Sequence, residues 1–148
     1  MRDNIIEYLV NYGFNEEELR KFQKENEKLY FANLNNVTTN IEFLSSKGLS
    51  QEEILEVVRK NAFMLTCSSK KKELLDNIYN SYFTKEEIKE LIIKYPDTYI
   101  LNPIEIRNNI EYLKLHNCND NIIKEFIKNN INIIDTNSKE FENMIKFS

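Results

Sequence analysis

The chain has 148 residues, of which 41% are hydrophobic and 30% charged, and its net charge at pH 7 is −4. This length and composition are typical of one globular domain with a core of its own, and they exclude a disordered chain. Only two Gly and two Pro occur, which leaves little material for barrels, sandwiches or glycine-rich phosphate loops, so an all-α fold is expected.

The chain begins Met1-Arg2-Asp3-Asn4-Ile5, with an acidic residue early and without the apolar stretch of a leader. Further along, no apolar run approaches the roughly 18 residues that a membrane span needs. We therefore expect neither a signal peptide nor a transit peptide and no membrane partner. We expect a cytoplasmic location.

A unit of roughly 35 residues repeats along the chain, which is the signature of a solenoid. The stretch Ile6-Glu7-Tyr8-Leu9 recurs in related form at 41–44, 75–78 and 110–113. We predict an α-solenoid, right-angle or superhelical, built from about four and a half two-helix repeats. It forms one domain over 1–148, with units at approximately 1–35, 36–69, 70–102 and 103–136 and a partial unit at 137–148.

Each unit is expected to hold two helices and a short apolar segment. In the second unit the first helix covers 36–47, and Gly48 suits the left-handed residue just past its end. Gly13 and Asn117 align with Gly48, whereas Tyr82 departs from the pattern and should weaken its turn. A second helix begins after Ser50 and carries an apolar stripe at helical spacing, formed by Ile54, Val57 and Val58.

Pairs of carboxylates recur at the start of the second helix in the first three units, which raises the question of an acid/base site. Their spacing is that of a capping box. In a capping box a small polar residue and the glutamate three positions later each accept a hydrogen bond from the backbone N–H of the other. A feature that recurs once per unit lacks the singular environment that catalysis requires. We therefore interpret these pairs as helix caps: Asn15 with Glu18, Ser50 with Glu53, and Thr84 with Glu87. The fourth unit begins Asn102-Pro103-Ile104-Glu105, which predicts Asn102 as its cap.

Signatures of catalysis and of metal binding are missing from the sequence. His116 is the one histidine, and its place near the end of a first helix predicts exposure to solvent. Cys118 occupies an apolar repeat position and Cys67 lies between units without a visible base, so neither is expected to be a nucleophile or a zinc ligand. We expect no enzyme, no catalytic residue, no metal and no cofactor.

The repeat resembles that of the mitochondrial transcription termination factor (mTERF) family. Residues 41–65, IEFLSSKGLSQEEILEVVRKNAFML, carry its pattern of a hydrophobic helix ending in L-x-x-x-G, a capped helix and an apolar segment. The stretch Lys94-Tyr95-Pro96 has the proline that often introduces this segment. The resemblance implies a solenoid that binds double-stranded DNA or RNA. Pentatricopeptide repeats share the period but favour a small residue where this chain has Leu19 and Ile54, so they rank lower.

A column of basic residues near the end of the second helices supports nucleic-acid binding. Lys24, Arg59 and Lys128 align, and Lys60 and Lys94 lie one position on. On a helical wheel Arg59 lies opposite the buried stripe, so its side chain should face solvent. Stacking of the units would place these basic residues at regular intervals, as contacts with successive phosphates require.

Two other interpretations stay open. Basic residues late in a helix also complement its dipole, and the cluster 70–72 of three lysines is consistent with solubility alone. The acidic balance and the many aromatic residues favour a protein-binding solenoid instead, acting as an adaptor or as an inhibitor of a larger partner.

Overall fold

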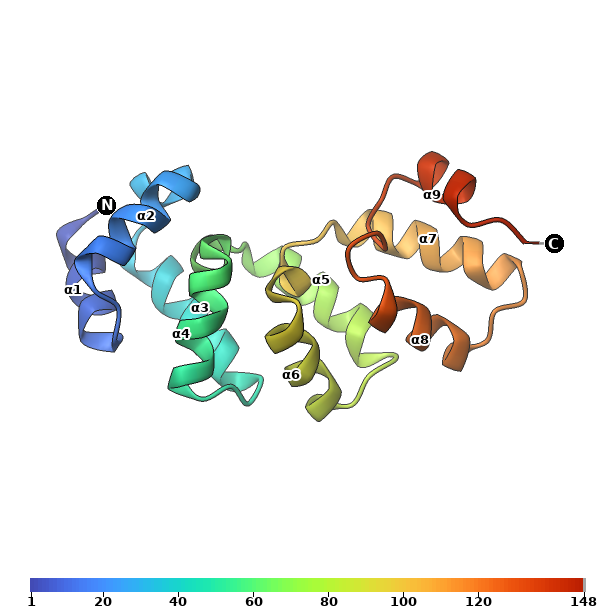
Figure 1. The fold of residues 1–148 in the computed structure, drawn as a ribbon, viewed down its shortest axis with the longest axis horizontal. Helices are drawn as coiled ribbons and strands as arrows, with labels where there is room; N and C mark the ends of the chain where they lie inside the picture. The colour runs from blue at the N-terminus through green and yellow to red at the C-terminus, as the bar shows by residue number, and fades with distance from the viewer. Residues whose placement is uncertain (148) are drawn as a thin grey trace.

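The computed structural model describes residues 1–147, and this part of the chain contains helices and turns but no strand. Nine α-helices and three 3₁₀-helices follow one another (Figure 1). The α-helices are α1 (Asp3–Tyr12), α2 (Glu16–Glu25), α3 (Leu34–Ser46), α4 (Gln51–Lys60), α5 (Ser69–Asn80), α6 (Lys85–Lys94), α7 (Pro103–Leu115), α8 (Asp120–Asn129) and α9 (Ser138–Met144). The 3₁₀-helices are η1 (Glu27–Tyr30), η2 (Ala62–Thr66) and η3 (Pro96–Tyr99).

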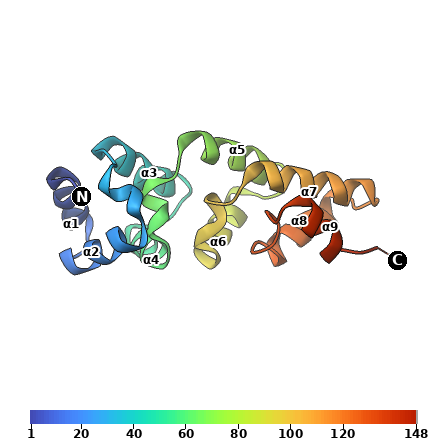
Figure 2. The ribbon, with the colours of Figure 1, turned by 90° about the horizontal axis from the view of Figure 1, so that it is seen from above.

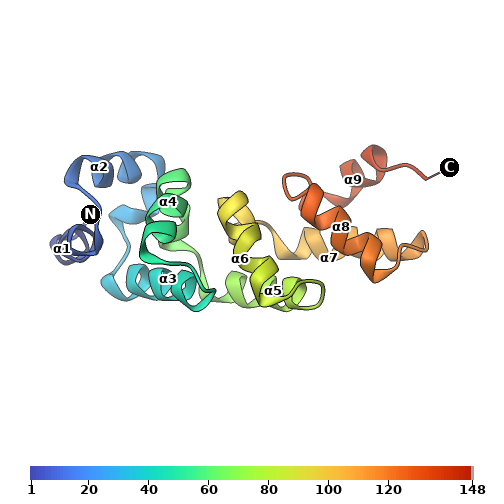
Figure 3. The ribbon, with the colours of Figure 1, turned by 60° about the horizontal axis from the view of Figure 1, so that its bottom comes forward.

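The units stack along the long axis as an α-solenoid, which confirms the predicted fold class. The first helices α1, α3, α5 and α7 form one layer, and the second helices α2, α4, α6 and α8 form the other (Figures 2 and 3). Each 3₁₀-helix follows a second helix and packs against its neighbours, η1 on η2 and η2 on η3. A single cluster of buried apolar side chains runs through the stack, because no unit covers its own apolar stripe.

The recurring carboxylates are caps, as predicted. In α2, α4 and α6 the side chain of the residue before the helix accepts a hydrogen bond from the backbone N–H of the glutamate three positions later. The carboxylate of that glutamate accepts a hydrogen bond from the backbone N–H of the residue before the helix. Asn102 caps α7 by accepting from the N–H groups of Ile104 and Glu105. The sequence placed the first helix of the second unit at 36–47, whereas α3 covers Leu34–Ser46. The helix begins two residues earlier than predicted because Asn33 and Asn36 form a further capping box.

Three of the four tight turns use a left-handed residue, which confirms the expectation for Gly13, Gly48 and Asn117. Each is followed by a residue whose N–H reaches five positions back, as from Phe14 to the carbonyl of Leu9 (3.0 Å). Tyr82 has no left-handed conformation. The unit closes instead with a bond from the N–H of Phe83 to the carbonyl of Tyr79 at 2.8 Å, four positions back. This shorter closure suits a unit without glycine at that place.

Tyr99 joins the second unit to the third. Its ring is fully buried and meets Phe43 and Tyr79 edge to face, at centroid distances of 4.9 and 5.3 Å. Its hydroxyl donates to the carboxylate of Asp76, which also accepts from Lys47 Nζ at 2.7 Å. These groups come from α3, α5 and η3, so one tyrosine fixes how the two units sit together.

Two buried asparagines hold the segment that follows the second helix of their own unit. The amide of Asn40 donates to the carbonyls of Leu65 (3.1 Å) and Cys67 (3.2 Å), and its oxygen accepts from Lys72 Nζ at 2.6 Å. Asn109 repeats the first two bonds in the last complete unit, to the carbonyls of residues 134 and 136. Its side-chain oxygen is buried without a hydrogen-bond partner within residues 1–147, because Phe141 stands at the repeat position of Lys72.

Candidate nucleic-acid interface

The solenoid has two edges with opposite charge character. The turn edge (residues 13–18, 48–53, 82–87 and 117–122) joins the two helices of a unit, and the link edge (24–34, 59–72, 94–105 and 128–138) joins one unit to the next. Figure 1 shows the turns of the first three units below and their links above. Second helices begin at the turn edge with carboxylates: Glu16, Glu17, Glu18, Glu52, Glu53, Glu86, Glu87 and Asp120. They end at the link edge with basic side chains: Lys24, Arg59, Lys60, Lys94 and Lys128.

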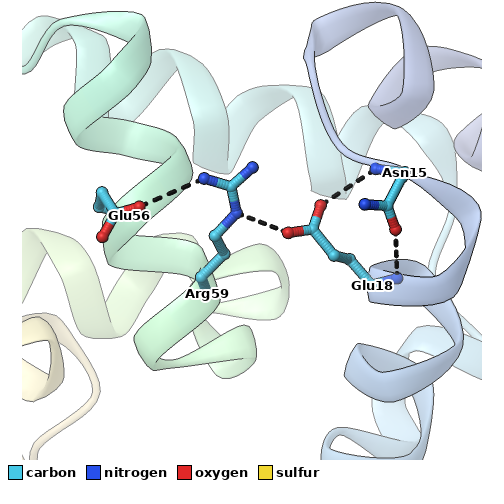
Figure 4. A network of polar contacts seen from close by, with 4 residues as sticks. All are labelled: Asn15, Glu18, Glu56 and Arg59. Atoms are coloured by element: carbon cyan, nitrogen blue, oxygen red, sulfur yellow. Dashed lines mark hydrogen bonds and ion pairs between the residues drawn. The ribbon is translucent and has the colours of Figure 1, made fainter.

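Arg59 is engaged with the preceding unit. Its Nε lies 2.7 Å from Oε1 of Glu18, and its Nη1 lies 3.2 Å from Glu56 on the same helix (Figure 4). Glu18 is the cap glutamate of α2, so one carboxylate closes the helix start and binds the next unit. Partial burial raises the pKa of Glu18, but the bonds from the Asn15 N–H and from Arg59 outweigh it and the net shift is downward.

The same pairing recurs in the next two units, with a different basic residue. Glu53 pairs with Lys89 (3.6 Å) and Glu87 with Lys124 (2.8 Å), and both lysines follow the first buried residue of their helix. In α4 the corresponding residue is Leu55, which packs against the turn at Gly13, where an added Cβ would lie 3.2 Å from it. Arg59, one turn later, takes over the ion pair.

Glu87 provides a test of this pairing through pH. The ion pair with Lys124, and next the N–H of Thr84, lower its pKa from near 4.5 to about 2. Its ionised form therefore stabilises the fold above pH 4.5, and this contribution disappears as the pH falls through 2. We expect Glu87→Gln to lower the free energy of unfolding by up to about 1 kcal/mol at pH 6, since both side chains are partly exposed. Urea unfolding followed by circular dichroism measures this.

At pH 2.5 the gap between Glu87→Gln and the parent should shrink, because the parent carboxylate is then partly protonated. Glu86→Gln is the matched control, since Glu86 is an exposed neighbour in the same helical turn that forms no ion pair within residues 1–147. A gap that is unchanged between pH 6 and pH 2.5 would show that the charge of Glu87 contributes nothing.

The other four predicted residues lie exposed at the ends of their helices. Lys24, Lys60, Lys94 and Lys128 form no ion pair in the described part of the chain, and Lys94 Nζ lies 5.3 Å from the ring centre of Tyr95. Lys94 and Lys128 line one hollow of about 200 Å³ between α6 and α8, which Glu87 and Glu90 also line. Contact of the five residues with nucleic acid stays a prediction, and the charge of Arg59 is already offset by its ion pairs with Glu18 and Glu56.

A stronger basic site lies on the link edge between the first three units, and the sequence interpretation missed it. Two adjoining hollows, of about 380 and 390 Å³, share Lys28, Thr66, Cys67 and Ser68 in their walls. We call them together the lysine groove; its remaining wall residues used below are Phe31, Asn35, Phe63, Ser69, Lys71, Lys72 and Ile100. Among residues 1–147 no carboxylate lines either hollow, whereas Glu or Asp lines the hollows between α5 and α7 and between α6 and α8.

The positive charge of the lysine groove has no acidic partner. None of Lys28, Lys70, Lys71 and Lys72 forms an ion pair among residues 1–147, and the residues 59–72 contain no carboxylate. Lys71 Nζ donates to the backbone carbonyl of Ile100 at 3.3 Å, which is a neutral acceptor. Lys72 is turned inward and burial lowers its pKa. The groove therefore attracts anions chiefly through Lys28 and Lys71 in its walls, and Lys70, next to Lys71 in the sequence, adds positive charge beside it.

The geometry does not favour catalysis at this groove. Burial raises the pKa of the Cys67 thiol to about 11 despite the neighbouring lysines, so it stays protonated at neutral pH. His116 is exposed, as expected, and its Nδ1 lies 2.9 Å from the carbonyl of Tyr112. Within residues 1–147 there is no group of three His, Cys, Asp or Glu side chains placed to hold a metal ion.

Comparisons with known proteins agree with the repeat architecture. The model of the mTERF family matches residues 1–147. No curated protein matches the chain. None of the helices formed by residues 1–147 has the length and apolar character needed to cross a membrane.

Proposed function

Because the chain belongs to the mTERF family, we propose that it is a non-catalytic helical-repeat protein that binds nucleic acid along its link edge. The observation that carries this proposal is the lysine groove, a carboxylate-free basic surface in a chain whose net charge is −4. Basic side chains without acidic partners create a local positive potential even in an acidic protein, and this potential attracts a phosphate backbone.

The lysine groove is the centre of the proposed interface. Lys28 comes from the first unit and Lys71 from the third, and both line one hollow, so they offer two phosphate contacts along the solenoid axis. The hydroxyls of Ser68 and Ser69 add neutral donors of the kind that position a nucleic-acid backbone. The exposed lysines at the ends of the second helices extend the surface to either side: Lys24, Lys60, Lys94 and Lys128. Arg59 contributes by holding two units together.

Reversing two charges in the groove tests the proposal. We expect Lys28→Glu/Lys71→Glu to weaken binding of duplex DNA or RNA by about 100-fold or more, because two phosphate contacts are lost and two repulsions appear. Fluorescence anisotropy with a labelled duplex at several salt concentrations measures the affinity. The slope of log affinity against log salt should become shallower by about 0.9 for each lost contact.

Lys85→Glu is the matched control, since Lys85 is an exposed lysine at the turn edge. It makes the same change of charge per site and should alter affinity by less than about threefold, since it lies outside the proposed interface. Equal losses from the two edges would show a general charge effect and would overturn the assignment of the link edge. Binding without salt dependence would overturn the proposal of phosphate contacts.

A protein partner is the second candidate function, and the last unit favours it. Leu115 is 79% exposed and Ile122 is 50% exposed, on either side of the turn between α7 and α8. Both side chains flank one turn, and large apolar residues exposed in this way are candidates for a contact surface. A partner bound there would leave the lysine groove free, so its binding should be insensitive to Lys28→Glu/Lys71→Glu.

A further inference from the structure

Two phenylalanine rings stand in solvent at the lysine groove. Phe31 is 85% exposed and lines one hollow, while Phe63 is 43% exposed and lines the other. Lys28 lines both hollows, so its charge is available at the hollow of each ring. Single exposed apolar side chains are common on protein surfaces, but two aromatic rings beside one basic groove are a specific arrangement.

The fold does not need these rings, and the repeat itself shows this. Counted from the residue that precedes each 3₁₀-helix, the position of Phe63 is occupied by Lys28 in the first unit and by Asp97 in the third. The position of Phe31 is occupied by Thr66 and Ile100 in the following units. The neighbouring position, by contrast, is buried in each of the three units that form a 3₁₀-helix: Leu29, Met64 and Thr98. The two rings are therefore additions to a frame that stacks without them.

The local backbone keeps both rings outward. Phe31 is the residue that ends η1, directly after a turn that buries Leu29. Phe63 lies within η2 between Ala62 and Met64, which are both buried, so its side chain takes the outer side of the helix. Rings held outward on short, packed helices are preorganised, so contact with a flat partner costs little conformational entropy.

The chemistry of the groove fits a single strand better than a duplex. Its walls combine an unpaired lysine, two exposed aromatic faces and neutral hydrogen-bonding side chains such as Asn35 and Ser69. Proteins that hold single-stranded nucleic acid use basic grooves for the backbone and aromatic rings for the bases. In a duplex the faces of the bases are stacked on one another, so it has no free base face to offer Phe31 or Phe63.

We infer that the lysine groove takes a single-stranded stretch of nucleic acid, with one base stacked on Phe31, one on Phe63 and the intervening phosphate on Lys28. This inference rests on the proposed function and narrows it to the strand that the groove prefers. Each hollow is of the size in which proteins hold small ligands, about 300–1,000 Å³, so each admits one nucleotide.

The test compares single-stranded and duplex probes on the full chain. Anisotropy is measured with oligo(dT) and oligo(U) of about 12 nucleotides and with a duplex of equal length. We expect Phe31→Ala and Phe63→Ala each to weaken binding of the single strands by about tenfold and binding of the duplex by less than twofold. Phe31→Trp should retain the affinity, whereas Phe31→Leu should lose it, because leucine is apolar but has no π-face. A difference between the two oligonucleotides would identify DNA or RNA as the preferred strand.

Val10→Ala serves as the control, since it removes an exposed apolar side chain (39%) on α1, outside both edges, and should leave every affinity unchanged. Circular dichroism spectra should confirm that the variants keep their helices, as expected for exposed positions. Duplex binding that depends on Lys28 and Lys71 but not on either ring would overturn this inference and leave the proposed function standing. An absence of salt-dependent binding to any of the probes would overturn both.

Discussion

Tyr99→Ala is expected to lower the free energy of unfolding by about 3–5 kcal/mol, the cost typical of removing a large buried ring. Tyr99 is fully buried and contacts Phe43 and Tyr79, so its loss leaves a cavity where the second and third units meet. It also removes one hydrogen bond from the carboxylate of Asp76. Because each unit of a solenoid contacts only its neighbours, the damage should reduce the coupling between the two halves of the stack.

Chemical denaturation followed by circular dichroism measures this effect. Tyr30→Ala is the matched control, because Tyr30 is the same residue at the same repeat position in the first unit but is 52% exposed. It should cost less than about 1 kcal/mol. Tyr99→Phe should fall between the two, since it keeps the ring and loses only the hydroxyl. Equal losses for Tyr30→Ala and Tyr99→Ala would contradict the role of Tyr99 as the joint between units.

Asn40→Leu is the second substitution with a large expected effect, about 3 kcal/mol. The change removes the donors that satisfy the carbonyls of Leu65 and Cys67 and the acceptor of Lys72 Nζ. Lys72 is 4% exposed, so its ammonium group would then be buried without a hydrogen-bond partner. A stranded buried charge costs more than a stranded neutral group. Denaturant unfolding at pH 7 measures the loss.

A double-mutant cycle with Lys72→Met separates the two parts of this cost. Lys72→Met alone should change stability by about 1 kcal/mol or less, since Val37, Ile106 and Phe141 occupy the same repeat position in other units. The double variant should be more stable than Asn40→Leu alone, because no ammonium group is left stranded. If Lys72→Met proved as damaging as Asn40→Leu, the bond between these side chains would itself be the main source of stability.

The features that depend on local spacing could be predicted from the sequence. A capping box spans four residues and a left-handed turn residue acts at one position. The roles of Ser50 and Glu53 as a capping box and of Gly48 as the turn residue could therefore be predicted from a few neighbouring residues. The recurrence of these signals at a fixed spacing predicted the solenoid, because helices of this size need neighbouring units to cover their apolar faces. Tyr82 lay outside the pattern, and its unit adopted a closure that the glycine rule does not describe.

The interface depends on how the units stack, and a helical wheel carries no such information. Arg59 is placed outward by the wheel, but its long side chain reaches Glu18 of the preceding unit, 41 positions earlier. Lys28 and Lys71 lie far apart in sequence and line one groove only after η1, η2 and the start of α5 are packed. The repeat alignment held one usable signal: Phe63 stands at a position where other units place charged residues.

The two edges of the solenoid also affect how the molecule meets a partner in solution. Acidic side chains outnumber basic ones along the turn edge, and basic side chains outnumber acidic ones along the link edge, so the chain behaves as a dipole in the field of a polyanion. Such a field exerts a torque that rotates the approaching molecule until its lysines lead, although the total force on a body of charge −4 is repulsive at long range. Productive encounters then begin within about a Debye length, roughly 10 Å at 0.1 M salt, where the near side dominates.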